Sequence, residues 1–293
     1  MYKQIDSNKR KTWLLMFIFI VVIIGLGWAW SQYYGDEAYG VIMLAAIFAL
    51  VMSLTSFYAG DKIALTQAGA KQITKDDNLY IWRLVENLSI TSGLPMPKVY
   101  IIEDTHMNAF ATGRDPQHAS IALTTGLINN LENEELEGVI AHELSHVKNY
   151  DIRLAMVVII CVGLITLLAD WMLRSFFWRD RRNSDNKNSG GILIIVGLIL
   201  ALLSPLFAKL IQLAVSRKRE FLADASGALL TRYPEGLAKA LKKISQQTQP
   251  LRTANKATAH LYFASPFSGR NVQKLFSTHP PIEARVKALM EMA

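Results

Sequence analysis

The amino-acid sequence predicts an α+β fold, in which a multi-pass helical membrane protein carries a mainly helical domain with a small antiparallel sheet. Two observations lead to this class. Apolar residues make up 51% of the 293 residues, and their excess lies in four uncharged runs, at residues 13–30, 38–60, 154–169 and 190–208. Between and after these runs the composition is that of a soluble domain, so membrane and soluble parts are expected to alternate along the chain.

Residues 1–60 form the predicted membrane anchor. A helix needs about 20 apolar residues to cross about 30 Å of hydrocarbon, and the runs at 13–30 and 38–60 satisfy this requirement. The alternative for the first run is a cleaved signal peptide, but its apolar core is too long and no small-residue cleavage site follows it. We therefore expect two transmembrane helices.

Basic residues set the expected orientation of this anchor. Four basic residues and one acid precede residue 13, whereas the loop between the two runs carries two acids and no base. The positive-inside rule therefore places the N-terminus in the cytoplasm, the short loop outside, and the chain from residue 61 onward in the cytoplasm again.

The net charge of +7 does not by itself indicate a nucleic-acid partner. Part of it follows the fourth apolar run, where Lys209 and residues 217–219 would face an anionic inner leaflet, so the lipid bilayer is an expected partner. A nucleic-acid binder would need a basic face with aromatic or groove-reading elements, and we expect no such partner. Cys161 is the one cysteine, so the sequence implies no disulfide.

Residues 61–153 predict the first part of a soluble domain. A helix is expected over residues 74–92, stopped by Gly93 and Pro95. Strands are expected at 97–104, 107–113 and 119–125, and the turn-rich segment before residue 119 joins the last two as an antiparallel hairpin.

A motif within residues 139–151, VIAHELSHVKNYD, carries the chemistry. His142 and His146 lie four apart on the helix predicted there, so both imidazoles project from one face, one turn apart. This spacing lets them bind a single Zn²⁺ at about 2.0–2.1 Å each, and Glu143 can reach a water on the same metal. The alternative is a helix with two incidental histidines. This interpretation is weaker, because three positions match the H-E-x-x-H pattern.

A catalytic zinc site needs a third protein ligand. No further histidine motif follows His146, so this ligand must come from elsewhere, and the candidate is Glu220 in RKREFLADASG. Asp224 lies four residues on, upon the same helical face, where it could orient one histidine while Glu220 binds the metal. Taken alone, such a pair of acids is more typical of a solvated helix face.

Residues 154–208 predict a helical hairpin inserted between these two motifs. Two crossings would return the chain to the side it left, so residues 209–293, the second part of the soluble domain, could meet the first part. The hairpin loop is basic, however, which the positive-inside rule opposes for an external loop. Either the N-terminal spans fix the orientation first, or the hairpin is partly embedded and partly cytoplasmic.

Four segments, HELSH, EFLAD, NAFATG and THPPIEAR, together with two N-terminal spans and the apolar insertion, give the chain a family likeness. The sequence resembles the HtpX-like membrane metalloproteases, relatives of the CAAX prenyl endopeptidases. The likeness covers essentially the whole chain, and its motifs are specific jointly. It implies a zincin-type, gluzincin-like domain in the cytoplasm, attached to a bacterial inner membrane.

The resemblance also implies residue roles. His142, His146 and Glu220 would bind one Zn²⁺, and Glu143 would activate water. Asn108 of NAFATG and His279 of THPP would contact the substrate backbone or stabilise the oxyanion. The structural alternatives are a turn residue for Asn108 and a capping or core histidine for His279.

Three functions follow from this interpretation. The first is a zinc endopeptidase that acts on misfolded or damaged membrane proteins, a substrate class that the resemblance supplies, with residues 120–124 as an exposed strand edge for the substrate. The second is a protease that processes CAAX-type, lipidated C-termini. The third is a non-catalytic membrane scaffold, which the glutamate of HELSH argues against because a structural zinc site does not need that base.

Overall fold

The computed structural model describes most of the chain, namely residues 2–34, 38–158, 160–161, 163–164, 217–247, 251, 261–264 and 280–293. Most of the predicted hairpin at 154–208, from residue 165 onward, lies outside the described residues. His279 lies outside them as well.

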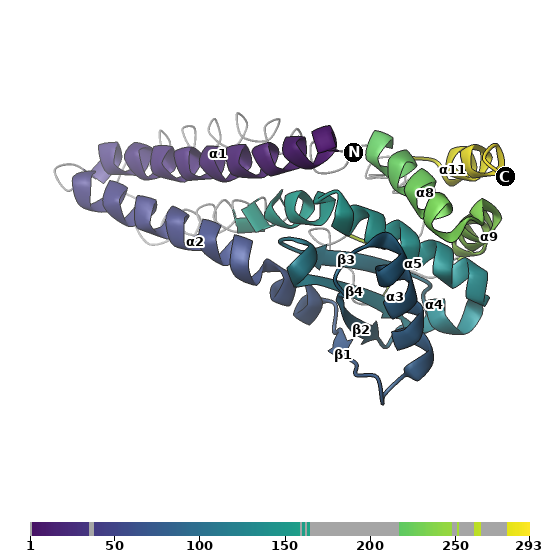
Figure 1. Cartoon of the computed structure of the whole chain (residues 1–293). Helices are drawn as coiled ribbons and strands as arrows, with labels where there is room; N and C mark the ends of the chain where they lie inside the picture. Colours follow the sequence, from purple (N-terminus) through teal and green to yellow (C-terminus); the bar gives the residue numbers. More distant parts are fainter. Residues whose placement is uncertain are drawn as a thin grey trace.

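Two long helices form the N-terminal part of the structure. α1 (Tyr2–Tyr34) and α2 (Ala38–Gln67) lie side by side and extend away from the rest of the molecule (Figure 1). Both are long and apolar enough to cross a membrane, over Gln4–Trp28 and Ile42–Gln67. Large apolar side chains on both helices are exposed, as expected for a surface that faces lipid.

The sheet differs from the prediction, because it is mixed rather than antiparallel. β1 (Lys71–Gln72), β2 (Lys98–Ile102), β3 (Ala109–Gly113) and β4 (Ala119–Thr124) lie in the order β1-β2-β4-β3. β3 and β4 form the predicted antiparallel hairpin, but β4 also pairs with β2 in parallel. β3 and β4 run in opposite directions, and β4 runs in the same direction as β2. β4 therefore lies between the two strands that precede it in the sequence.

The prediction that residues 120–124 form an exposed strand edge is wrong. They belong to β4, which lies between β2 and β3 and pairs with both strands, so β4 has no free edge. The edge strand of the hairpin is β3 instead, and it contacts α5 (Asn133–Lys148), the helix that carries the HELSH motif.

Two local signals place α5. Acidic residues fill its first turn, where they complement the helix dipole, and the side chain of Glu135 accepts a hydrogen bond from the backbone N–H of Glu132 at 2.9 Å. Most of the helix is buried, because it packs on β3 and on helices from both parts of the soluble domain. These helices are α3 (Leu79–Ser92), α8 (Arg217–Thr231) and α9 (Pro234–Ser245).

Further helices complete the domain around α5. In Figure 1 the sheet lies on one side of α5, and α8, α9 and α11 lie on the other. The C-terminal end of α3 is as predicted, since Gly93 terminates this helix with a φ of 69°. The N-terminal end is not: the helix was expected from residue 74 but begins at Leu79, because the side chain of Asn78 caps it by accepting from the backbone N–H of Ile81. The shorter elements are η1 (Pro116–His118), α4 (Thr125–Asn130) and α11 (Ile282–Met290).

The chain after α5 joins the soluble domain to the N-terminal helices. Tyr150 breaks the helix with a φ of 59°, and residues 151–158 are helical again. Apolar side chains of this second helical stretch are buried against α1 and α2, in a cluster that includes Leu154, Val157, Leu15 and Phe19. The start of the third apolar run therefore packs on the predicted membrane anchor.

Candidate metal centre

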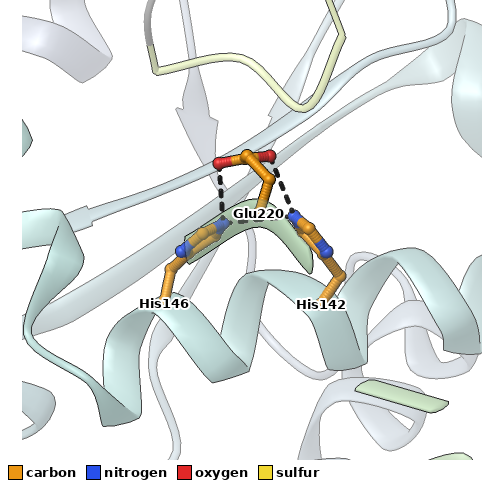
Figure 2. A group of neighbouring side chains, drawn as sticks. All are labelled: His142, His146 and Glu220. Atoms are coloured by element: carbon orange, nitrogen blue, oxygen red, sulfur yellow. Dashed lines mark hydrogen bonds and ion pairs between the residues drawn. The ribbon is translucent and has the colours of Figure 1, made fainter. Parts of the chain in front are cut away.

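α5 presents two imidazoles toward one point. His142 and His146 lie one helical turn apart, and their Nε2 atoms are 3.1 Å from each other. His142 is fully buried and His146 is largely buried. Figure 2 shows both rings pointing from α5 toward the same carboxyl group.

α8 supplies that carboxyl group from Glu220. Its Oε2 atom lies 3.8 Å from Nε2 of His142, and its Oε1 atom lies 3.6 Å from Nε2 of His146 (Figure 2). The close approach of the two helices requires a glycine, because a Cβ atom on Gly227 of α8 would lie 3.0 Å from the backbone nitrogen of His142. The structure thus brings together the three residues that the sequence proposed as ligands, across a separation of 74 residues between His146 and Glu220.

These three residues fit a zinc ion. Their ligand atoms all lie within 4.8 Å of one another, and ligands of a tetrahedral zinc at about 2.0–2.1 Å are separated by roughly 3.3 Å. Two imidazoles and one carboxylate form a donor set that leaves a tetrahedral position open for water.

Two carboxylates orient the histidines so that the Nε2 atoms face the centre. Asp224 lies 2.9 Å from Nδ1 of His142, and Asp151 lies 3.0 Å from Nδ1 of His146. A carboxylate accepts a hydrogen bond from the N–H at Nδ1, which leaves the lone pair of Nε2 available to a metal. Asp224 therefore lies where the sequence predicted a residue that orients a histidine.

The electrostatics of the cluster favour a cation. Burial lowers the pKa of His146, but the hydrogen bond to Asp151 and the charges of Glu220, Asp151 and Glu143 outweigh it and raise the pKa to about 9. Burial dominates at His142 and lowers its pKa to about 4. The carboxylates around His146 thus favour positive charge at the centre, which a divalent ion would supply.

Arg285 of α11 compensates part of this negative charge. It is 1% exposed and binds Asp224 through two hydrogen bonds of 2.8 and 2.6 Å. Burial raises the pKa of Asp224, but Arg285 and His142 outweigh it and lower the pKa to about 2. The guanidinium also lies 4.9 Å from the ring centroid of Phe263, whose ring packs edge-on against His142.

Glu143 lies beside the edge strand. Its carboxyl group is buried, with 3% of the residue exposed, and Oε2 accepts a hydrogen bond of 2.8 Å from the backbone N–H of Ala111 in β3. Its charge raises the pKa of both His146 and Arg285, which places it in the same electrostatic cluster.

Asn108 holds a neighbouring segment in place. It is fully buried, and its amide both donates to the carbonyl of Ala264 at 3.0 Å and accepts from the Ala264 N–H at 3.2 Å. These bonds fix residues 261–264, which carry Phe263, next to the start of β3. The described contacts therefore favour a supporting role for Asn108 over direct contact with substrate.

Sequence reasoning missed Asp151 and Arg219. Asp151 lies five residues after His146, directly after the turn that ends α5. Arg219 precedes Glu220 and donates to Oδ1 of Asp151 at 3.0 Å. The signal for Asp151 was an acid within reach of the second histidine, but the left-handed turn at Tyr150 that directs it there is not evident from sequence.

The comparison with known families decides the identity. The family model described as "Peptidase family M48" matches residues 75–293, which include every described residue of the candidate centre. The chain belongs to peptidase family M48. As an M48 member it is a metallopeptidase, so the predicted resemblance is confirmed and the interpretation as a non-catalytic scaffold is wrong.

Relatives of this M48 peptidase match it along its whole length. The "Protease HtpX homolog" of Dictyoglomus turgidum is 47% identical over 294 residues, covering 99% of this chain and 94% of that protein. The "Protease HtpX homolog" of Tropheryma whipplei (strain Twist) is 46% identical over 293 residues, covering 100% of this chain and 98% of that protein. The crystal structure of S. mikatae Ste24p has a similar fold, with a TM-score of 0.51 and 21% identity over 99% of this chain and 67% of that one.

Proposed function

We propose that this M48 peptidase is a membrane-bound zinc endopeptidase that cleaves misfolded or damaged membrane proteins on the cytoplasmic side of a bacterial inner membrane. The observation that carries the proposal is the cluster of His142, His146 and Glu220, with Glu143 beside it. When bound, zinc would supply the Lewis acid that activates water and polarises the scissile carbonyl.

The side chains of the chain would perform the remaining chemistry. Glu143 takes a proton from the attacking water while the water oxygen bonds to the scissile carbonyl carbon. Glu143 then delivers that proton to the amine nitrogen as the C–N bond breaks. The carboxylates of Asp224 and Asp151 hold the two imidazoles in the tautomer that faces the metal. For His279 we retain the role that the resemblance implies, stabilisation of the oxyanion.

The substrate would bind in an extended form beside β3. This strand is the sheet edge next to Glu143, and its Ala111 N–H already donates to that side chain. An extended peptide that adds to a strand edge is held mainly by its backbone, so little sequence preference is needed. Weak sequence preference suits a protease that removes damaged proteins of many kinds.

Chelation tests the enzymatic proposal directly. The full-length protein, purified in detergent, should digest casein, lose this activity on treatment with 1,10-phenanthroline, and recover it when zinc is restored, because activity needs the ion held by the cluster. Metal content measured on the same samples should follow activity. Casein digestion that persists in metal-free protein would contradict the proposal. Cleavage of a prenylated CAAX peptide, without cleavage of casein or of an unfolded membrane protein, would support the processing protease instead.

The two-helix anchor begins and ends beside the peptidase domain. Near the N-terminus, Asn8 of α1 contacts the end of α5, and α2 leads directly into β1, so both ends of the two-helix anchor lie at the peptidase domain. The basic N-terminus would hold this common side in the cytoplasm.

Cysteine labelling tests this orientation. In a Cys161→Ser background, Asp36→Cys in the short loop should react with an impermeant maleimide applied to spheroplasts, because this loop is expected outside. Asp76→Cys, which replaces an exposed residue ahead of α3, should react only after lysis. The reverse pattern would place the peptidase domain outside.

A further inference from the structure

The N-terminal turns of α1 contain a buried amide outside the uncharged run. Asn8 is 0% exposed, although it lies in the basic, polar segment before residue 13. α1 has 33 residues, about 50 Å at 1.5 Å per residue, so it is longer than the roughly 30 Å of hydrocarbon that it would cross. Its first turns can therefore lie outside the hydrocarbon and contact the peptidase domain.

The side-chain amide of Asn8 donates two hydrogen bonds at the end of the HELSH helix. Nδ2 donates to Oδ1 of Asp151 at 2.7 Å and to the carbonyl of Asn149 at 2.9 Å. Both partners are acceptors, so the NH₂ group of the amide, rather than its oxygen, must face them. Burying the NH₂ group of the amide without such bonds would be costly, which indicates that they hold Asn8 in this position.

Asp151 connects this amide to the metal centre. Its Oδ2 atom lies 3.0 Å from Nδ1 of His146, while its Oδ1 atom accepts from Asn8 and from Arg219. A single carboxylate thus links the N-terminal helix, α8 and one of the proposed metal ligands. Its orientation sets the direction of the His146 ring.

The turn directly before Asp151 needs external support. Tyr150 has a φ of 59°, a left-handed conformation that is strained for a residue with a side chain. Two contacts from α1 flank it: the amide of Asn8 on the Asn149 carbonyl, and the ammonium of Lys9 at 4.4 Å from the centroid of the Tyr150 ring. Neighbouring residues of the N-terminal helix therefore hold the turn.

We propose that Asn8 is a positioning residue of the metal centre, which fixes Asp151 and through it the metal-binding orientation of His146. The N-terminal membrane helix is then a component of the peptidase site as well as an anchor. This inference rests on the proposed zinc site. Because Arg219 also binds Asp151, loss of the amide should weaken metal binding rather than abolish it.

Zinc affinity of the full-length protein in detergent tests this role without relying on activity. Asn8→Asp keeps the shape of the side chain, removes the donor and places a second carboxylate against Asp151. It should weaken zinc binding about tenfold in competition with a chromophoric chelator, the lower end of the effect seen for partners of metal ligands. Asn8→Ala removes the amide without adding a charge, and it should weaken binding in the same direction.

Two further readouts separate positioning from a general loss of structure. The visible spectrum of the Co²⁺-substituted protein should change in both Asn8 variants, because the ligand field at His146 changes, and casein digestion should recover at saturating zinc. Thr12→Val is the matched control: Thr12 is also buried, one turn further along α1, and its hydroxyl donates to the Asn8 carbonyl rather than to Asp151. It should leave zinc affinity and the Co²⁺ spectrum unchanged.

The possible outcomes are distinct. Wild-type affinity and an unchanged Co²⁺ spectrum in both Asn8 variants would overturn the positioning role and leave the zinc site intact. An equal loss of affinity in Thr12→Val would also overturn it, since α1 would then act only through folding. If the wild-type protein itself fails to bind zinc, the proposed function fails first.

Discussion

Replacing Glu143 by glutamine is expected to abolish peptide hydrolysis while the protein retains zinc. Glutamine has nearly the shape of glutamate, and its carbonyl oxygen can still accept the hydrogen bond from Ala111 N–H. It cannot take a proton from water, so the general-base contribution of about 10²–10⁴-fold is lost. His142, His146 and Glu220 remain in place to bind the ion.

Rates of casein digestion and zinc content, measured on the same preparations, check this expectation. Glu134→Gln is the matched control, because Glu134 lies in the first turn of the same helix but is exposed. It should digest casein at the wild-type rate. A Glu143→Gln variant that cleaves at a rate within a few-fold of wild type would refute the assignment of the base.

Replacing Glu220 by alanine is expected to remove the metal and with it the activity. The two histidines come from one helix turn, and Glu220 is the proposed ligand that arrives from α8, with its oxygens 3.6 and 3.8 Å from their Nε2 atoms. Loss of a partner of a metal ligand costs about 10–100-fold in affinity, and loss of a ligand itself should exceed that range. Affinity should therefore fall by more than about 100-fold.

Zinc content after gel filtration, with affinity from chelator competition, measures this effect. Lys218→Ala changes an exposed residue of the same helix, two positions before Glu220, and should retain zinc and activity. The folded state of both variants can be compared by circular dichroism. A Glu220→Ala protein that keeps stoichiometric zinc would show that the third ligand lies elsewhere in the chain.

The site residues that sequence could predict are those whose relative positions depend only on residues close together in the chain. His142, Glu143 and His146 follow from helical spacing, because positions four apart share a face whatever the fold. Glu220 needed the family resemblance, since two acids four apart are common on solvated helices. Asp151, Arg219 and Asn8 could not be predicted, because the hydrogen bond between Asn8 and Asp151 joins residues 143 positions apart.

The same division applies to the fold. The β3–β4 hairpin was predicted because a turn-rich segment joins its two strands. The parallel pairing of β2 with β4 was not, because the strand that inserts beside β2 depends on tertiary packing rather than on adjacent sequence. β1 has two residues and exists only through its pairing with β2, so its sequence carries too little pattern to predict a strand.

The packing of the helix after Tyr150 on α1 limits how this enzyme can be divided. A fragment that lacks residues 1–60 would expose Leu154 and Val157 to water, and it would leave Asp151 without its Asn8 partner. The peptidase domain and the two N-terminal helices are therefore expected to fold as one unit. Biochemical work on this peptidase therefore has to begin from detergent-solubilised or nanodisc-reconstituted intact chain rather than from an excised catalytic fragment.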